Sequence, residues 1–553
     1  MLEAFTAWPQ EISAEYIRKG YWRGLTIGDI IDLAVKDYPA KEAIVSEHDR
    51  VTYTQLVERV NRLALGLLEL GIRKGDRIIV QLPNWPEFLY LHYAAARIGA
   101  VNVMALPRHR GREIGHLLNF TEASAIAIPF HFKDFNYLDM VEELRLKCPR
   151  LKHIIVAGEE APEETVSFNS MMNSTIGTKY PENYLEKFKP AATDVAFLLL
   201  TGGTTGFPKC VPRTHNDFIC IYSSLAKLKD YSSERVFLVN LPLSHTAALG
   251  KCTNAAMVGA KLVLRATTRP EDTTVTIETE KVTDIMLVPS QVFDLLKILE
   301  QGNHNLNSLR LIEIGGSYTP PDLVRRLETR ISGKVLNALG SSEGVHFTPR
   351  ISDPLEVRAE TVGRPCCQDD EFRIVDEEGV DVMPGTEGEL CVRGPHCIRG
   401  YYKSQEESRK AFDNEGFYHT GDLAMIDKNG NIRITGRKKD LIIRGGENIG
   451  ATEVEEILRL HLKVDDAAVV GMPDARLGEK VCAYIKPKDD LAISLEEVVI
   501  FLKEKGIAIY KLPERIELVP QFPLTNIGKV NKKALREDIA TKLRKDKFNF
   551  GRQ

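Results

Sequence analysis

The sequence has few long hydrophobic runs and no excess of charge of one sign. Its most span-like apolar stretch, residues 89–106, is interrupted by His92 and Arg97, so it predicts no membrane span. The N-terminus shows no basic segment followed by an apolar core, so it indicates no cleaved secretion signal. The 73 basic and 77 acidic residues give a net charge of −4, which does not favour binding of nucleic acid. We therefore expect a cytoplasmic protein with no membrane and no nucleic-acid partner.

Cysteine and histidine occur without the spacing of a disulfide framework or a zinc motif. The nine cysteines contain no CxxC pair, although Cys366 and Cys367 are adjacent. The thirteen histidines contain no HExxH pair. This spacing favours reduced thiols and does not predict a structural metal site.

The first two-thirds of the chain alternates helix-like and strand-like segments. Leu56, Val60 and Leu63 recur at helical spacing, and Gly71 ends that helix before a strand-like run at 77–82. Further short apolar runs lie at residues 43–47, 152–158, 195–200, 261–266 and 284–289. The alternation predicts an α/β fold in which several sheets are flanked by helices. With 553 residues, the chain is also too long for a single core.

The pattern changes near residue 437 to that of a small α+β domain. Two capping-box patterns predict helix starts on either side of a strand-like run: Thr452 with Glu455, Ser494 with Glu497, and residues 480–487 between them. Residues 437–440 are charged and suit an exposed hinge. We therefore expect a large N-terminal domain, 1–436, and a small C-terminal domain, 437–553.

A stretch rich in glycine and threonine, TGGTTGFPK, follows the apolar run 195–200. Glycine lets backbone N–H groups approach a phosphate, and Lys209 adds a positive charge. Pro208 stands directly before this lysine, so the stretch lacks the GxxxxGK[ST] order of a P-loop, and it also lacks GxGxxG. The residues thus indicate a phosphate loop of another kind, with a flexible surface loop as the alternative.

This loop and several other motifs resemble those of the adenylate-forming superfamily of acyl-CoA synthetases, peptide-synthetase adenylation domains and luciferases. The other motifs follow in the family's order: LPNWPEF (82–88), LPLSH (241–245), IGGS (314–317), NALGSSEG (337–344), GELCVRGPHCIRGYY (388–402), YHTGD (418–422), GRKKDLIIRGGENI (436–449) and PLTNIGKVNKKAL (523–535). The resemblance covers nearly the whole chain. It looks greatest to the stand-alone 2,3-dihydroxybenzoate-AMP ligases of siderophore pathways, and it implies a multi-sheet large domain with a mobile small one.

The resemblance implies a reaction in which a carboxylate attacks the α-phosphate of ATP, pyrophosphate leaves, and a thiol attacks the acyl-adenylate. The implied partners are a carboxylic acid, ATP, Mg²⁺, and the phosphopantetheine thiol of coenzyme A or of a separate carrier protein. Since both partners of the first step are anions, catalysis consists mainly of positioning and charge neutralisation. An acyl-CoA synthetase for a non-aromatic acid and a catalytically silent nucleotide-binding homologue are the alternatives.

The same resemblance assigns roles to individual residues. It implies that the β- and γ-phosphates are held by Thr201, Gly202, Gly203, Thr204, Thr205, Gly206 and Lys209. It places the nucleotide against Gly316, Ser317, Asn337, Leu339, Gly340, Ser341, Ser342, Asp422 and Arg437. Glu343 is expected to hold Mg²⁺, Lys529 to stabilise charge between the carboxylate and the α-phosphate, and Lys439 to lie at the hinge. Leu339 stands where the family usually has an aromatic ring, which removes π-stacking on adenine.

The resemblance leaves the acid open. It places the acid near His245, Thr246, Gly315, Gly340 and His346, and His245 is also expected among the catalytic residues. The aryl-acid branch normally has asparagine, which reads an ortho-hydroxyl, where this chain has Thr246. His346 and Lys251 either line this pocket or lie on the surface. We expect an aryl or similarly compact acid rather than a long fatty acid.

Overall fold

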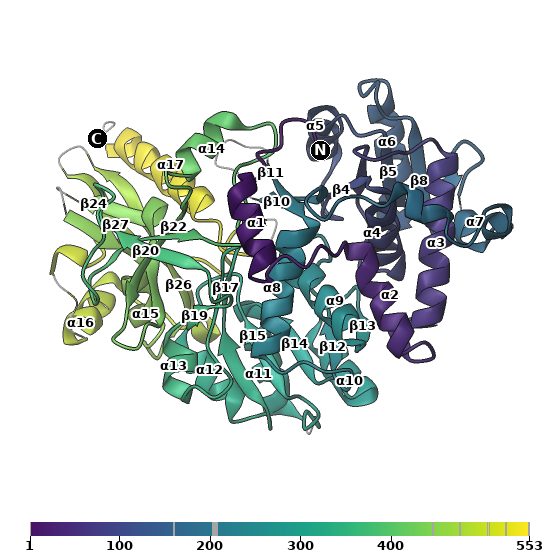
Figure 1. The fold of residues 1–553 in the computed structure, drawn as a ribbon. Helices are drawn as coiled ribbons and strands as arrows, with labels where there is room; N and C mark the ends of the chain where they lie inside the picture. Colours follow the sequence, from purple (N-terminus) through teal and green to yellow (C-terminus); the bar gives the residue numbers. More distant parts are fainter. Residues whose placement is uncertain are drawn as a thin grey trace. The chain divides into compact units, whose positions relative to one another are not determined.

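The computed structural model describes residues 2–158, 161–201, 208–302, 304–444, 447–474, 477–505, 507, 509–525 and 528–550. The chain divides into two compact units (Figure 1). The large unit comprises Met1–Phe372 and Val392–Tyr418, and the small unit comprises Arg373–Cys391 and His419–Gln553. The boundary predicted at residue 437 is the hinge of a mobile domain. A division of the chain into compact units does not locate a hinge, so the hinge stays a prediction.

Two seven-stranded sheets organise the large unit. The first has the order β11-β10-β4-β3-β5-β8-β9: Lys209–Thr214, Val195–Thr201, Val101–Met104, Arg77–Val80, Ala125–Pro129, His153–Ala157 and Val166–Ser167. The second has the order β16-β15-β14-β12-β13-β1-β2: Lys334–Asn337, Leu311–Ile314, Asp284–Leu287, Val236–Val239, Lys261–Leu264, Glu42–Val45 and Arg50–Thr52. Each is parallel except for one antiparallel edge pair, β10 with β11 and β1 with β2. The apolar runs predicted as strands are thus confirmed.

Helices and smaller strands complete the large unit. Its α-helices are α1 Gln10–Arg18, α2 Ile27–Asp37, α3 Tyr53–Glu69, α4 Pro86–Ile98, α5 Gly111–Thr121, α6 Tyr137–Arg145, α7 Phe168–Asn173, α8 His215–Leu228, α9 Thr246–Val258, α10 Pro270–Glu280, α11 Pro289–Gln301, α12 Pro321–Glu328, α13 Leu355–Glu360 and α14 Gln405–Ala411. A short sheet follows the order β17-β18-β19: Leu339–Gly340, His346–Thr348 and Arg364–Pro365. A hairpin pairs β6 His131–Phe132 with β7 Phe135–Asn136, and two 3-10 turns cover Thr175–Lys179 and Tyr184–Phe188.

The predicted helix that contains Leu56, Val60 and Leu63 is α3. Thr52 caps α3 through a reciprocal capping box with Gln55, and the helix ends at Glu69, just before Gly71. Strands such as β5 are buried along their whole length, as expected for a parallel sheet covered on both faces. One apolar cluster packs against each large sheet.

The small unit is α+β. A four-stranded sheet belongs mainly to it, in the order β20 Glu371–Val375, β21 Gly388–Arg393, β22 Tyr418–Ile426 and β23 Ile432–Arg437. Its other elements are η3 Lys438–Asp440, β24 Leu441–Arg444, β25 Glu447–Gly450, α15 Ala451–Leu458, β26 Val464–Asp474, β27 Gly478–Pro487, η4 Lys488–Asp490, α16 Leu495–Glu504, η5 Ile509–Lys511, β28 Arg515–Leu518 and α17 Lys532–Phe550. The α/β class with several sheets and a smaller α+β part is thereby confirmed. Among the described residues, no helix has the length and apolarity needed to cross a bilayer.

One of the two predicted helix caps in the small unit is wrong. The helix α15 begins at Ala451 with Gly450 as its N-cap, so Thr452 lies inside the first turn and cannot cap it. The other cap is present, since the Ser494 hydroxyl accepts a hydrogen bond from the backbone N–H of Glu497 at 3.2 Å. Capping follows the backbone conformation of the preceding residue, which the S/T-x-x-E pattern alone does not fix.

Buried neutral histidines are a feature of the large unit. His92 on α4 is 2% exposed, and neither of its ring nitrogens has a hydrogen-bond partner among the described residues. Burial lowers the pKa of His92 to about 3 and that of His215 to about 4. Both imidazoles therefore stay uncharged in the folded chain at neutral pH.

We expect acid to destabilise the protein partly through His92. The unfolded imidazole gains a proton below about pH 6.5, while the folded one does so only near pH 3. The free energy of unfolding then falls by up to about 1.4 kcal/mol per pH unit as the pH decreases through this window. The Tm of His92→Leu, relative to wild type, should rise as the pH is lowered from 7 to 5. The exposed His48→Leu is the control, and parallel Tm curves for His92→Leu and wild type would contradict the argument.

Candidate functional site

The phosphate loop connects two antiparallel strands. Thr201, the last residue of β10, pairs with Lys209, the first residue of β11. The predicted phosphate-holding residues between them, Gly202, Gly203, Thr204, Thr205 and Gly206, lie outside the described residues. The hairpin therefore fixes both ends of the loop at one edge of the first sheet.

Lys209 is held by an acid and an aromatic ring. Its Nζ atom forms a 2.5 Å ion pair with Oε2 of Glu407 on α14 and lies 4.7 Å from the ring centroid of Tyr401. The hydrogen bond from Lys209 lowers the pKa of Glu407. A phosphate that binds Lys209 must therefore compete with this carboxylate.

Glu343 is a buried acid with one defined partner. It is 5% exposed, and Tyr401 Oη donates a 3.0 Å hydrogen bond to its Oε1 atom. Burial is the main cause and the charge of Glu343 the second cause of a raised pKa of Tyr401. The hydroxyl therefore keeps its proton and donates a hydrogen bond to Glu343. A carboxylate offers about four acceptor positions, so one phenol leaves capacity for Mg²⁺, which prefers such oxygens. Glu343 thus fits the predicted metal-holding role. Tyr401 lies in the motif 388–402, but no role was predicted for it from the sequence.

Arg213 on β11 fixes the segment that carries Glu343. Its fully buried guanidinium pairs with Asp217 at 2.7 Å and donates to the backbone oxygens of Ser342 at 2.8 Å and His396 at 3.0 Å. The segment Ser341–Glu343 is therefore attached to the strand that begins with Lys209. The sequence signal was an arginine directly after the apolar residues 210–212, followed four residues later by an aspartate.

The residues expected to contact adenine lie at the ends of two neighbouring parallel strands. Ile314 on β15 pairs with Asn337 on β16, so the segment 315–317 leaves the sheet beside Asn337. The backbone N–H of Ala338 donates to Ile314 O at 2.8 Å and continues this pairing. The carboxyl ends of parallel strands are the usual ligand-binding edge of such sheets.

Thr246 begins α9, with His245 as its N-cap residue. Tyr222 Oη donates a 2.8 Å hydrogen bond to Thr246 O and lies 3.4 Å from Thr246 Oγ1. A Cβ atom on Gly250 would lie 1.9 Å from Cζ of Tyr222. Tyr222 therefore packs over the first turn of α9 because residue 250 has no side chain.

Lys251 is buried rather than exposed, which removes the surface alternative for this residue. Its Nζ atom donates to Oε1 of Glu313 and, at 3.0 Å, to Tyr231 Oη. Lys229 Nζ donates to the second oxygen of Glu313 at 2.5 Å. Burial alone would raise the pKa of Glu313, but the two lysines hold it well below its usual range. Burial lowers the pKa of Lys229 to about 8.

His346 lies next to another predicted pocket residue. It pairs with Gly340 across β17 and β18. Its Nε2 atom is buried and has no hydrogen-bond partner among the described residues. Burial, followed by the charge of Lys229, lowers the pKa of His346 to about 3, so it is neutral at pH 7.

The ribose-binding candidates belong to the small unit. Asp422 and Arg437 are paired residues of β22 and β23, and Arg437 Nε lies 2.6 Å from Asp422 Oδ1. Glu389 supports this segment, because its oxygens accept from Gly421 N and Lys438 Nζ at 3.1 Å each. Burial would raise the pKa of Glu389, but bonds from His419 and Lys438 lower it to about 2.

The backbone of Lys529 contacts Thr525 in the small unit. Thr525 N donates to Lys529 O at 2.6 Å, and Lys529 N donates to Thr525 Oγ1 at 3.1 Å. The backbone of Lys529 is thus fixed on both sides by one threonine. The side chain of the predicted hinge residue Lys439 lies outside the described residues. The site residues are therefore divided between the units, with Asp422, Arg437, Lys439 and Lys529 in the small one.

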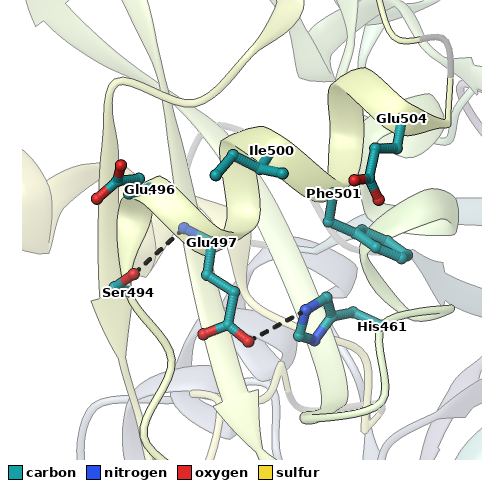
Figure 2. A pocket seen from close by; sticks show the side chains of 7 residues that line it. All are labelled: His461, Ser494, Glu496, Glu497, Ile500, Phe501 and Glu504. Atoms are coloured by element: carbon teal, nitrogen blue, oxygen red, sulfur yellow. Dashed lines mark hydrogen bonds and ion pairs between the residues drawn. The ribbon is translucent and has the colours of Figure 1, made fainter.

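A surface pocket of about 360 Å³ in the small unit is a different feature (Figure 2). It is lined by His461, Ser494, Glu496, Glu497, Ile500, Phe501 and Glu504. His461 Nε2 lies 3.6 Å from Glu497 Oε1. Three carboxylates would repel a triphosphate, so this pocket does not fit the predicted nucleotide site.

Comparisons with known proteins agree with the motifs. The AMP-binding enzyme family matches residues 31–402, and the AMP-binding enzyme C-terminal domain matches residues 453–529. The chain is 39% identical over 545 residues to the 2,3-dihydroxybenzoate-AMP ligase of Bacillus subtilis (strain 168), covering 98% of this chain and 99% of that protein. It is 36% identical over 543 residues to a salicylyl-CoA synthase / salicylate adenylyltransferase of Streptomyces sp, covering 98% of each. The solved anthranilate CoA ligase AuaEII with anthranoyl-AMP matches with a TM-score of 0.85 and 25% identity, covering 94% of this chain and 98% of that one.

The two mainly parallel sheets and the smaller α+β unit, together with these matches, identify an adenylate-forming ligase that uses ATP. The chain belongs to the AMP-binding enzyme family. This confirms the resemblance drawn from the motifs and the prediction of a ligase. The roles of individual residues stay predictions.

Tyr401→Phe tests the support of Glu343. The variant keeps the ring beside Lys209 and removes only the hydroxyl. A hydrogen bond to a charged group contributes about 1.5–3 kcal/mol, so we expect ATP–pyrophosphate exchange to slow roughly 10- to 100-fold at limiting Mg²⁺. High Mg²⁺ should restore part of the rate. Tyr402→Phe is the matched control, because the ring of Tyr402 packs on Phe120. Wild-type rates for Tyr401→Phe at every Mg²⁺ concentration would rule out this role.

Proposed function

We propose that this protein uses ATP to convert an aryl carboxylic acid into its acyl-adenylate and then transfers the acyl group to a phosphopantetheine thiol. The observation that carries this proposal is the 39% identity, over 98% of the chain, to a protein named for 2,3-dihydroxybenzoate. The names of the other two matches contain salicylate and anthranilate. All three acids are benzoates with an ortho substituent that can form hydrogen bonds.

The large unit supplies the groups for the phosphates in this proposal. Lys209 exchanges Glu407 for the triphosphate, and Glu343 holds Mg²⁺ beside Tyr401. The Mg²⁺ ion, when bound, offsets the negative charge of the phosphates. Because the attacking carboxylate is already ionised at neutral pH, no general base is needed for adenylation.

The small unit supplies the groups for the ribose and the reacting centre. Asp422 accepts hydrogen bonds from the ribose hydroxyls. Its carboxylate must then bind the ribose and Arg437 at the same time. Lys529 stabilises the charge that develops between the acid and the α-phosphate. Rotation of the small domain about Lys439, expected from the family, then exposes the adenylate to the thiol.

The acceptor is coenzyme A or a separate carrier protein. The name of the Streptomyces relative includes a CoA synthase, whereas that of a Mycobacterium tuberculosis relative includes a salicyl-S-ArCP synthetase, so both acceptors stay candidates. An acyl-CoA synthetase for a non-aromatic acid is the second candidate. A catalytically silent homologue is disfavoured because Lys209, Glu343 and Lys529 are all present. The cytoplasmic location expected from the sequence stays a prediction.

ATP–pyrophosphate exchange against a panel of acids tests the proposal and the role of Thr246 together. Threonine has one hydroxyl and a shorter reach than asparagine, so it is a weaker partner for an ortho-hydroxyl. A site without a strong partner discriminates weakly among such acids. We therefore expect wild type to accept benzoate, 2-aminobenzoate, salicylate and 2,3-dihydroxybenzoate with kcat/KM values that differ by less than about 100-fold.

The variant Thr246→Asn should shift preference toward salicylate and 2,3-dihydroxybenzoate. Thr253→Asn on the same helix is the control, because its hydroxyl bonds to Leu249 O within the helix. A wild-type preference of several decades for the dihydroxy acid would refute the role given to Thr246. Exchange with aliphatic acids alone would refute the aryl-acid proposal itself.

Lys529→Ala should separate the two half-reactions. One charge-stabilising donor is worth about two to three decades in rate, so adenylation should fall about 100- to 1000-fold. ATP binding, Tm and thiol attack on supplied acyl-adenylate should change little, because the lysine acts at the first reacting centre. The exposed Lys533→Ala on α17 is the matched control. Pyrophosphate exchange within a few-fold of wild type would show that the role assigned to Lys529 is wrong.

A further inference from the structure

Three metal-ligating side chains meet in the interior of the large unit. Cys366 follows β19, Asp370 precedes β20, and His396 lies in the segment after β21. Cys366 is 5% exposed, and the side chains of His396 and Asp370 are 0% and 1% exposed. None of these three side chains has a role in the proposed adenylation.

The distances between their donor atoms suit one shared cation. Cys366 Sγ lies 3.5 Å from His396 Nε2, which in turn lies 2.7 and 2.8 Å from the two oxygens of Asp370. One donor atom from each residue lies within 4.8 Å of the others. Zinc bonds of about 2.3 Å to sulfur and 2.0 Å to nitrogen give a tetrahedral S–N edge of about 3.5 Å, as found here. The distance between His396 Nε2 and the ligating oxygen of Asp370 would have to increase by about 0.5 Å for both atoms to bind one zinc ion.

The imidazole of His396 is oriented as a metal ligand is. Its Nδ1 atom lies 2.5 Å from Gly344 O, and a carbonyl oxygen only accepts, so Nδ1 carries a proton. The Nε2 atom then faces the thiol and the carboxylate. A ligating histidine typically donates its other ring N–H to such a carbonyl. A Cβ atom on Gly344 would lie 1.9 Å from His396 O, so this approach depends on glycine.

The carboxylate of Asp370 faces His396 with both of its oxygens. Oδ1 lies 2.7 Å and Oδ2 lies 2.8 Å from His396 Nε2, and Oδ2 also accepts a hydrogen bond from Cys367 N at 3.1 Å. Without a metal these contacts form a buried ion pair between His396 and Asp370. A cation bound by Oδ1, Nε2 and Sγ would take the place of the proton on Nε2.

A second trio in the small unit shows the contrast. Glu389, Cys391 and His419 also lie close together. Both oxygens of Glu389 already accept hydrogen bonds, from Gly421 N and Lys438 Nζ. An ammonium group thus occupies the place that a cation would take, so this trio carries no comparable argument.

We propose that Cys366, Asp370 and His396 bind one divalent transition-metal ion, with Zn²⁺ the best match for a sulfur, nitrogen and oxygen donor set. Binding displaces the thiol proton of Cys366 and the Nε2 proton of His396 to solvent, and it leaves one tetrahedral position for a further ligand. The ion is structural. It fastens the β19–β20 connection to the segment of His396, whose backbone oxygen Arg213 also holds. The ligands are separated by 3 and 25 residues, which is why no zinc spacing is visible in the sequence.

Metal analysis of the full-length protein, purified without a histidine tag, tests this site. Wild type should contain about one equivalent of zinc after dialysis, and Cys366→Ser should contain little. Cys482→Ser is the matched control, because Cys482 is also fully buried but lies on β27. After zinc removal by chelator, Co²⁺ should give a thiolate-to-cobalt charge-transfer band in wild type and Cys482→Ser but not in Cys366→Ser.

Stability gives a second readout that does not depend on activity. Zinc added to the chelator-treated protein should raise the Tm of wild type and leave that of Asp370→Asn unchanged. The asparagine variant keeps the size of the side chain, so it serves if Cys366→Ser fails to fold. Metal-free wild type with no cobalt band would overturn the proposal and leave a His396–Asp370 ion pair in its place. Equal zinc in Cys366→Ser and wild type would overturn it as well.

Discussion

The buried guanidinium of Arg213 is the interaction on which the candidate site of the large unit depends. It has no exposure to water, so each of its contacts must replace solvent. Asp217 supplies the opposite charge, while the backbone oxygens of Ser342 and His396 complete the set. Removing such a partner leaves an uncompensated buried charge, which typically costs about 3–5 kcal/mol. One side chain thereby joins the phosphate hairpin to the segment of Glu343.

The strands and the order of the motifs could be predicted from the sequence because both are local. Apolar runs such as 195–200 are long enough to be buried strands, and the strand that ends at Thr201 falls where expected, whereas its antiparallel partner from Lys209 was not predicted. Ile314 and Asn337 each begin a motif that the sequence shows, but only the parallel pairing of their strands brings them to one edge. Local sequence was therefore sufficient for the strands and motifs, and not for this pairing.

The contacts that tune the site could not be predicted, since they join distant residues. Tyr401 reaches Glu343 across 58 positions, and Lys251 reaches Glu313 across 62. Neither spacing leaves a pattern, and only burial shows that Lys251 is not a surface lysine. The capping error at Thr452 has a local cause, because Gly450 takes the N-cap position. Pattern alone does not choose between two adjacent helix starts.

The charged groups buried next to the segment 315–317 bear on the kind of ligand that fits the carboxyl ends of β15 and β16. Two ammonium groups, Lys229 and Lys251, share the single carboxylate of Glu313. Nearby Arg235 and Asp284 form a balanced pair. His346 adds no charge at pH 7, because burial lowers its pKa to about 3. The two ammonium groups next to these strand ends therefore outnumber the carboxylate that they share. Such an excess favours an anion over a neutral ligand, and a wall of apolar side chains would provide no such preference.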